Sequence, residues 1–242
     1  MELRLRPEPD PVPEGGVGGA WHALRTAPSA VLLLVQLAGV LLYPFLVDLS
    51  IGPWEGAGRS LLGLFGLLVL GLAVLAVRAT PALTWVSVVA GAPAAVLTVL
   101  EGFRPDQQWV VLTSAGFHAV FYLYTGYALI RYMFNDTWVT SDELWATGAA
   151  FTVVAWGWAY VYVLVQAAWP GSFSGAVAPE GPRTFFDLLF LSFTVLTSTG
   201  LSDIVPLLPH ARAVVMIEQV AGMLYLAVVV ARIVGLTIIR QR

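Results

Sequence analysis

Residues 184–206 decide the fold of this chain: Thr184-Phe-Phe-Asp-Leu-Leu-Phe-Leu-Ser-Phe-Thr-Val-Leu-Thr-Ser-Thr-Gly-Leu-Ser-Asp-Ile-Val-Pro206. A short apolar stretch runs directly into hydroxyl-bearing residues around Gly200. From Thr184 to Thr197 the stretch as a helix is about 20 Å long, which is too short to cross about 30 Å of hydrocarbon. Thr184 is placed to cap this helix, and Asp187 lies in its first turn, at the positive end of the helix dipole. We therefore expect a short helix whose far end points toward the membrane centre, followed by irregular backbone.

The composition is that of an integral membrane protein. Of the 242 residues, 58% are hydrophobic and only 11% are charged, whereas soluble domains are usually about one-quarter charged. There is no cysteine, which excludes disulfides and thiolate metal sites. The net charge of −3 is too small to indicate a nucleic-acid partner.

Six apolar runs are each near or above the roughly 20 residues that cross a bilayer. They are 29–48, 58–78, 81–100, 109–131, 143–168 and 207–236. The sequence thus predicts an all-α membrane protein of six transmembrane helices, with a re-entrant helix and loop between the fifth and the sixth. Arginines favour cytoplasmic termini by the positive-inside rule, since more of them fall on that side. Those on the inner side are Arg4, Arg6, Arg25, Arg78, Arg131, Arg232, Arg240 and Arg242, against Arg59, Arg104, Arg183 and Arg212 outside.

The runs divide the chain into three parts. Residues 1–28, rich in Pro, Gly and acidic groups, are expected to form a disordered cytoplasmic tail. Residues 29–135 form a four-helix unit without the arginine ladder that voltage sensing needs. Residues 140–242 form the pore-type unit of helix, short helix, loop and helix, beginning with a capping-box pattern at Thr140–Glu143. No soluble ligand-binding domain is expected after it.

The segment Thr197-Ser-Thr-Gly-Leu-Ser-Asp203 resembles the selectivity filter of potassium channels, which is usually Thr-Thr-Val-Gly-Tyr-Gly-Asp. The flanking helices resemble the bacterial six-helix members of that family over about 130–240. The resemblance implies a homotetramer, because each chain supplies one filter strand. It also implies monovalent cations, K⁺ or Na⁺, held by the backbone carbonyls of Ser198, Thr199 and Gly200 in place of water.

Two positions of the usual filter are changed. Gly200 keeps the first glycine, which serves a positive-φ position, but Ser202 replaces the second and Leu201 replaces the tyrosine. A non-glycine residue in the left-handed region costs roughly 1–2 kcal/mol, so Ser202 either carries strain or lets the outer filter relax. Leu201 cannot donate the hydroxyl bond of the tyrosine. We expect an intact inner half and an altered outer half, with Asp203 concentrating cations at the mouth.

The last helix contributes two further candidate residues. Gly222, at the spacing of the inner-helix glycine of potassium channels, is expected to be a gating hinge, although a lone membrane glycine usually marks close packing. Glu218 lies one turn earlier, and a carboxylate at membrane depth is a functional candidate. We expect it to support the filter from behind by bonding Thr194 or Thr197; direct attraction of cavity cations is the alternative. His118, in the fourth run, is expected to be a packing residue.

The function expected from these features is passive conduction of monovalent cations across the cell membrane, with potassium modestly favoured. No enzymatic activity and no cofactor beyond the permeant ion are expected, since no span carries a catalytic constellation. The partners expected are the lipid bilayer and further copies of the chain. Two alternatives remain open: a weakly selective sodium/potassium channel, and a non-conducting scaffold or regulatory subunit that kept the fold.

Overall fold

The computed structural model describes residues 27–48, 65–75, 81–103, 107–134 and 141–240. Its helices are α2 (Pro28–Asp48), a helical segment at Phe65–Leu75, α4 (Pro81–Phe103), α5 (Gln108–Met133), α6 (Ser141–Ala168), α7 (Phe185–Leu196) and α8 (Pro209–Arg240). The strands β1 (Phe173–Ser174) and β2 (Val205–Pro206) pair antiparallel, Phe173 with Pro206 and Ser174 with Val205. The tail 1–26 and the cap residue Thr140 lie outside the described residues.

Proline sets the start of three of these helices. α2, α4 and α8 each begin at a proline, the residue whose missing N–H is harmless at the first helical position and whose φ is already helical. Within the described residues, three helical windows are long and apolar enough to cross a membrane: Pro28–Phe45, Leu144–Ala168 and Pro209–Arg232. Helices α4 and α5 occupy the third and fourth predicted runs, and the segment Phe65–Leu75 lies inside the second.

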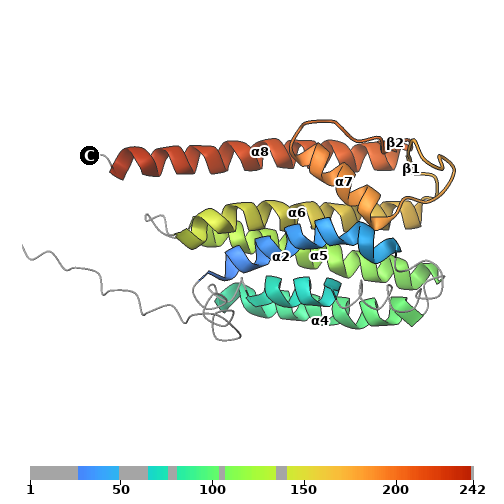
Figure 1. The fold of residues 1–242 in the computed structure, drawn as a ribbon, viewed down its shortest axis with the longest axis horizontal. Coiled ribbons are helices and arrows are strands. Elements are labelled where there is room, and N and C mark those ends of the chain that lie inside the picture. The colour runs from blue at the N-terminus through green and yellow to red at the C-terminus, as the bar shows by residue number, and fades with distance from the viewer. Residues whose placement is uncertain (1–26, 49–64, 76–80, 104–106, 135–140, 241–242) are drawn as a thin grey trace, which may run out of the picture.

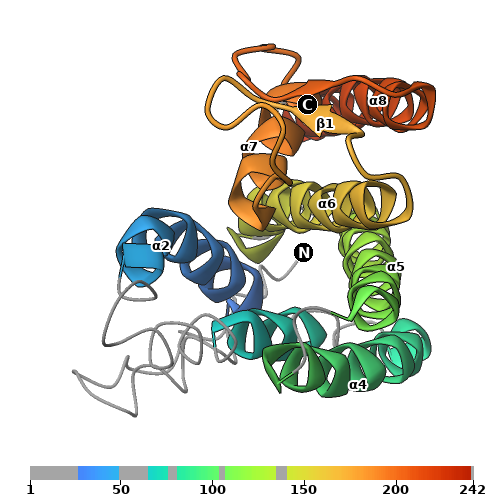
Figure 2. The same ribbon diagram turned by 90° about the vertical axis from the view of Figure 1, so that its right-hand side faces the viewer.

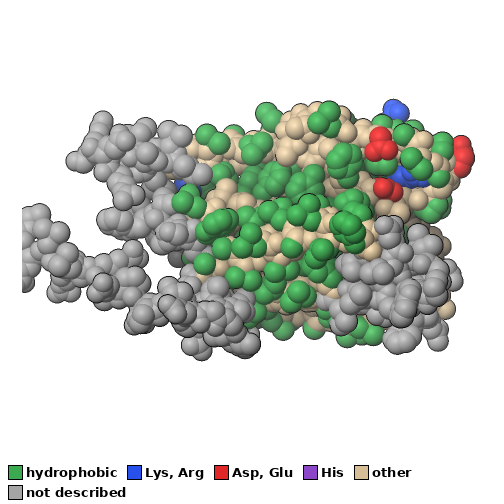
Figure 3. Space-filling model, viewed as in Figure 1, with side chains coloured by type: hydrophobic (Ala, Val, Ile, Leu, Met, Phe, Trp, Pro, Cys, Tyr) green, Lys and Arg blue, Asp and Glu red, His purple; other side chains and the backbone are tan. Residues whose placement is uncertain are grey.

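The long helices run roughly along one axis, with α7 lying obliquely between α8 and α6 (Figure 1), and Figure 2 shows them end on. In that view α8 and α6 lie one above the other with α7 beside them, while α4 lies farthest from α8. On the face drawn in Figure 3, hydrophobic side chains cover the middle of the helices, and the charged side chains of the described residues gather at the end that holds β1 and β2.

One hydrophobic core joins the four-helix unit to the pore-type unit. It contains Leu32 of α2, Phe121 of α5, Val153 of α6 and Leu189 of α7, all nearly or fully buried. A second cluster, at the β1–β2 end, gathers Tyr162, Phe173, Leu188, Ile204 and Ala211 around α6, α7 and α8. The short helix α7 thus has a core on each side.

Aromatic rings hold the beginning of α7. Phe185 packs on Tyr160 and Trp156 of α6, with ring centroids 4.7 and 5.6 Å apart. The next residue, Phe186, stacks on Tyr43 of α2 at 4.5 Å, with the two planes only 7° apart. Helix α2 therefore contacts the start of α7 directly.

Candidate functional site

Helix α7 begins at a complete capping box. The Thr184 amide donates to Asp187 Oδ2 (2.9 Å), and the Asp187 amide donates to Thr184 Oγ1 (3.2 Å). Two of the N–H groups that a helix start leaves free are thereby satisfied, and the carboxylate lies at the positive end of the dipole. The predicted bounds Thr184 to Thr197 are the two caps of the observed helix.

The far end of α7 is closed by a Schellman motif. The Thr199 amide donates to the carbonyl of Thr194 (3.0 Å), and the Ser198 amide to that of Val195 (3.0 Å). Such a motif needs a left-handed residue just after the helix, usually glycine. Here Ser198 takes that conformation, with φ of 57°.

The loop 197–203 follows, and its backbone alternates in handedness at its beginning. Ser198 and Gly200 have φ of 57° and 65°, so the positive-φ conformation expected at Gly200 is observed. Ser202 is not among the described residues with positive φ. Ser202 thus lacks the left-handed conformation in which strain was expected; the relaxed outer segment stays a prediction.

The carbonyl groups of this loop are unengaged. No hydrogen bond between residues that the structure describes is accepted by a carbonyl oxygen of 197–202. Residues 197–201 are also exposed on the single chain. Backbone carbonyls that leave water need another partner, and here consecutive ones are available.

The depth of the loop follows from a contact between α7 and α8. A Cβ added at Gly222 would lie 2.6 Å from the carbonyl oxygen and 2.8 Å from the Cα of Leu196. Gly222 therefore packs directly on the backbone at the end of α7, and it lies near the middle of the 24-residue candidate span Pro209–Arg232. The loop starts at half the depth of that span, and the chain then returns to the end of the molecule that holds β2 (Figure 1).

The second half of the loop is fixed by the chain that follows it. The Ser202 Oγ accepts a hydrogen bond from the Ile204 amide (3.0 Å), and Ile204 is buried in the cluster with Tyr162 and Phe173. Leu201, in contrast, is 77% exposed. Asp203 is also exposed, at the β1–β2 end where the mouth was expected.

Glu218 of α8 is fully buried, and its carboxylate faces α6 and α7. The Ser192 hydroxyl lies 2.5 Å from its Oε1 and 3.0 Å from the carbonyl oxygen of Ala155, and the Tyr162 hydroxyl donates to its Oε2. One carboxylate thus joins three helices.

The prediction that Glu218 bonds Thr194 or Thr197 was wrong. Thr194 and Thr197 instead donate within their own helix, to the carbonyls of Leu191 (2.8 Å) and Phe193 (2.7 Å), as hydroxyls in apolar helices often do. The sequence held a signal for Ser192, because it falls on the same helical face as Leu188 and Val195, which are both buried. Tyr162, on another helix, had no such signal.

We predict that Glu218→Gln is tolerated and Glu218→Leu is not. Glutamine can still accept from Tyr162 and donate to Ser192. Leucine leaves the buried Tyr162 hydroxyl without its acceptor, at about 1–3 kcal/mol, while Ser192 keeps only the Ala155 carbonyl. Thermal unfolding of the purified protein and its unitary conductance are the measurements. Equal loss of conductance in both variants would favour the alternative, attraction of cations by the charge.

The His118 ring makes hydrogen bonds through both of its nitrogens and stacks on an aromatic ring. Its Nδ1 lies 2.8 Å from the carbonyl oxygen of Ser114, its Nε2 lies 3.0 Å from Thr98 Oγ1, and its ring stacks on Tyr160 at 4.5 Å. These contacts join α5 to α4 and α6, as the packing interpretation expects.

Comparison with known proteins agrees with this site. A family model described as "Ion channel" matches residues 148–238, from the third turn of α6 to the last turn of α8. The match covers less than half of the chain, and it contains α7 and the 197–203 loop. No curated protein and no solved structure matches the chain. The matched residues support a pore-loop ion channel, and the described chain is mostly helical.

Proposed function

We propose that the protein is a pore-loop cation channel of the cell membrane, in which the 197–203 loops of four copies form a selectivity filter. The observation that carries the proposal is the row of unengaged carbonyls at 197–202, which starts beside Gly222 at mid-span. Irregular backbone at membrane depth is tolerated where it is buried in protein or lines a water-filled path. The negative end of the α7 dipole points toward the same place and favours a cation.

The need for further copies follows from the exposed surfaces of one chain. A buried stripe of α8 (Ala211, Val215, Glu218, Gly222 and Val229) faces its own chain, while the opposite face is apolar and exposed. That exposed face includes Met216, Ile217, Val220, Met223 and Leu224, each at least 58% exposed. One loop cannot enclose an ion, so we infer a homotetramer around the loop and α8.

The membrane arrangement belongs to the same proposal. Six spans, with both termini cytoplasmic and the β1–β2 end outside, leave Asp203 at the outer mouth. There a ring of four carboxylates would raise the local cation concentration.

Selectivity is proposed to favour potassium only modestly. In the inner half of the loop positive φ recurs at Ser198 and Gly200, whereas in the outer half Ser202 lacks it. Such alternation is what would let successive carbonyls face one ion path. Ions would then meet two or three well-formed carbonyl rings at Ser198, Thr199 and Gly200, and a wider outer vestibule. A weakly selective sodium/potassium channel is the nearest alternative.

The test is flux through the purified protein in liposomes, with bi-ionic reversal potentials for K⁺ against Na⁺. Cation flux by tetramers would support the proposal. Intact tetramers without flux under any gradient would contradict it and favour a non-conducting scaffold or regulatory subunit.

We predict that Leu201→Tyr combined with Ser202→Gly raises the potassium-over-sodium permeability ratio. The change restores a hydroxyl that can brace the filter and a residue that adopts positive φ without strain. Ser202→Ala is the matched control, because it removes the bond to the Ile204 amide and adds no backbone freedom. Unchanged reversal potentials in the double variant would reject this account of the outer filter.

A further inference from the structure

The outer half of the proposed filter is supported by the residues that follow it, and not by a side chain at position 201. Leu201 is exposed, and the chain after it is anchored at Ile204, which is 4% exposed, and at the β1–β2 pair. The Leu207 amide extends that pair by donating to the carbonyl of Ser172 (2.8 Å). The support of the outer filter therefore comes from the segment between α6 and α7.

Within that segment, the loop 175–183 is folded around the guanidinium of Arg183. Nη1 donates to the carbonyl of Val177 (2.8 Å), Nε and Nη2 donate to that of Gly181 (3.2 and 2.6 Å), and Nη2 also donates to that of Ala178. Arg183 is only 7% exposed. Within the part of the chain that the structure describes, these acceptors are all main-chain oxygens, and they match the planar fork of the side chain.

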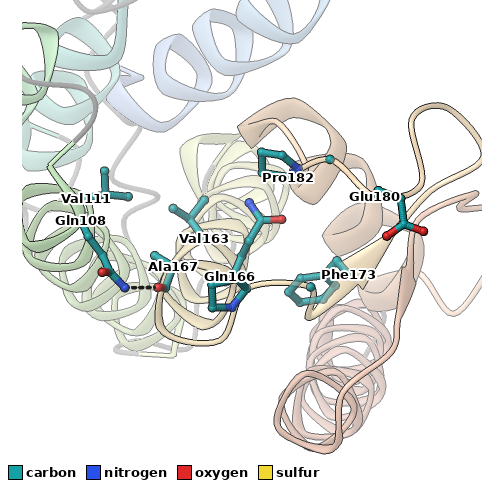
Figure 4. Close-up of a pocket in the computed structure, with 11 residues that line it drawn as sticks. Gln108, Val111, Val163, Gln166, Ala167, Phe173, Glu180 and Pro182 are labelled. Atoms are coloured by element: carbon teal, nitrogen blue, oxygen red, sulfur yellow. Dashed lines mark hydrogen bonds between the residues drawn. The ribbon is translucent and has the colours of Figure 1, made fainter.

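The backbone of Arg183 is fixed as well, by Gln166 near the end of α6. The Arg183 amide donates to Gln166 Oε1 (2.8 Å), and Gln166 Nε2 donates to the Arg183 carbonyl (2.9 Å). Figure 4 shows Gln166 together with Phe173, Glu180 and Pro182 around a cavity of about 480 Å³ at this end of the molecule. The main chain and the side chain of Arg183 thus each make at least two hydrogen bonds.

Gly175 connects this cluster to the filter. A Cβ at Gly175 would lie 2.6 Å from Arg183 Nη1 and 2.8 Å from Ile204 Cδ1, so the glycine backbone is held between the two side chains. Ile204 directly follows Asp203. A displacement of the guanidinium therefore reaches the end of the filter loop through one intervening residue.

We propose that Arg183 is a positioning residue for the outer filter, and that it takes the place of the hydroxyl brace that Leu201 lacks. It acts through the fork geometry of its bonds to the 175–183 loop, more than through its charge. This inference rests on the proposed function, because its main readout is ion selectivity.

The experiment compares four full-length variants with the wild-type protein in liposomes, by bi-ionic reversal potential. Arg183→Lys keeps the charge and loses the fork, and Arg183→Gln loses both. Gln166→Leu releases the Arg183 backbone without changing any charge. Arg212→Gln is the matched control, because Arg212 is exposed near the same end and its side chain, among the residues that the structure describes, donates to the Pro206 carbonyl alone (3.2 Å). Amide hydrogen exchange of Leu207 reports the β1–β2 pair independently of conduction.

We expect R183K, R183Q and Q166L to shift the reversal potential in the same direction and to speed exchange at Leu207, while R212Q changes neither. Wild-type behaviour in R183K, or an equal shift in R212Q, would overturn the proposal, since charge alone would then explain the effect. If the Arg183 variants do not assemble, the Q166L variant provides the test. A shifted reversal potential in Q166L would support the proposal, and an unchanged reversal potential would overturn it. Absence of wild-type flux would instead reject the proposed function, and unchanged exchange in R183K would then reject the positioning role by itself.

Discussion

Gly222→Ala is expected to abolish conduction and to destabilise the protein. The added methyl group would meet the Leu196 carbonyl oxygen at 2.6 Å, and the neighbouring atoms are backbone, which cannot rotate away. Overpacking of this kind typically costs about 1–3 kcal/mol in each chain. It would also displace the end of α7, where the proposed filter loop starts. Thermal unfolding and flux in liposomes measure the two effects.

Gly116→Ala is the control for this substitution. Gly116 lies inside helix α5, and no atom of the described residues beyond its own helix backbone comes within 4 Å of a Cβ added there, so alanine gains helix propensity at no steric cost. If Gly222 acts only as a hinge, Gly222→Ala should alter opening and leave the unfolding temperature unchanged. A variant of normal stability would therefore speak against the packing role and for the hinge expected from the sequence.

Gly200→Ala is the second change for which we expect a complete loss of conduction. Gly200 has a φ of 65°, and a side chain there is strained by roughly 1–2 kcal/mol in each chain. The loop would relax to another conformation and turn its carbonyls away from the proposed ion path. Single-channel recording of the reconstituted variant is the measurement.

Gly171→Ala separates this effect from backbone strain in general. Gly171 has a φ of 80° and, like Gly200, no atom within 4 Å of an added Cβ, but it lies in the turn after α6. Its variant should carry a similar strain and still conduct. Undiminished current in Gly200→Ala would count heavily against the filter assignment.

Local features of the site could be predicted from the sequence. The cap at Thr184, the first-turn Asp187 and the end of the helix at Thr197 are properties of neighbouring residues, and the structure has all three. The positive φ of Gly200 likewise follows from its residue type and its place in the filter-like pattern. The left-handed Ser198 was not predicted, because serine is not the usual residue for that position.

Contacts between distant segments were harder to predict. Glu218 was expected to face α7, and it does, but the choice of Ser192 over Thr194 depends on the rotation of α7 about its axis. The structural role of Arg183 was not predicted, because its side chain binds backbone carbonyls, and these are present at every residue whatever its type. Both misses concern tertiary geometry.

The stack of Phe186 on Tyr43, and of Tyr160 on His118, has a consequence for how the chain can be divided. The C-terminal part of the chain is not packed independently of the helices before it. An excised fragment beginning at residue 140 would expose the Phe186 and Tyr160 rings that α2 and α5 now cover, and α7 would lose its contact with α2. Helix α2 thus contacts α7 directly through Tyr43, and α5 contacts α6, the neighbour of α7, through His118, so a change in either helix would reach α7 over a short path.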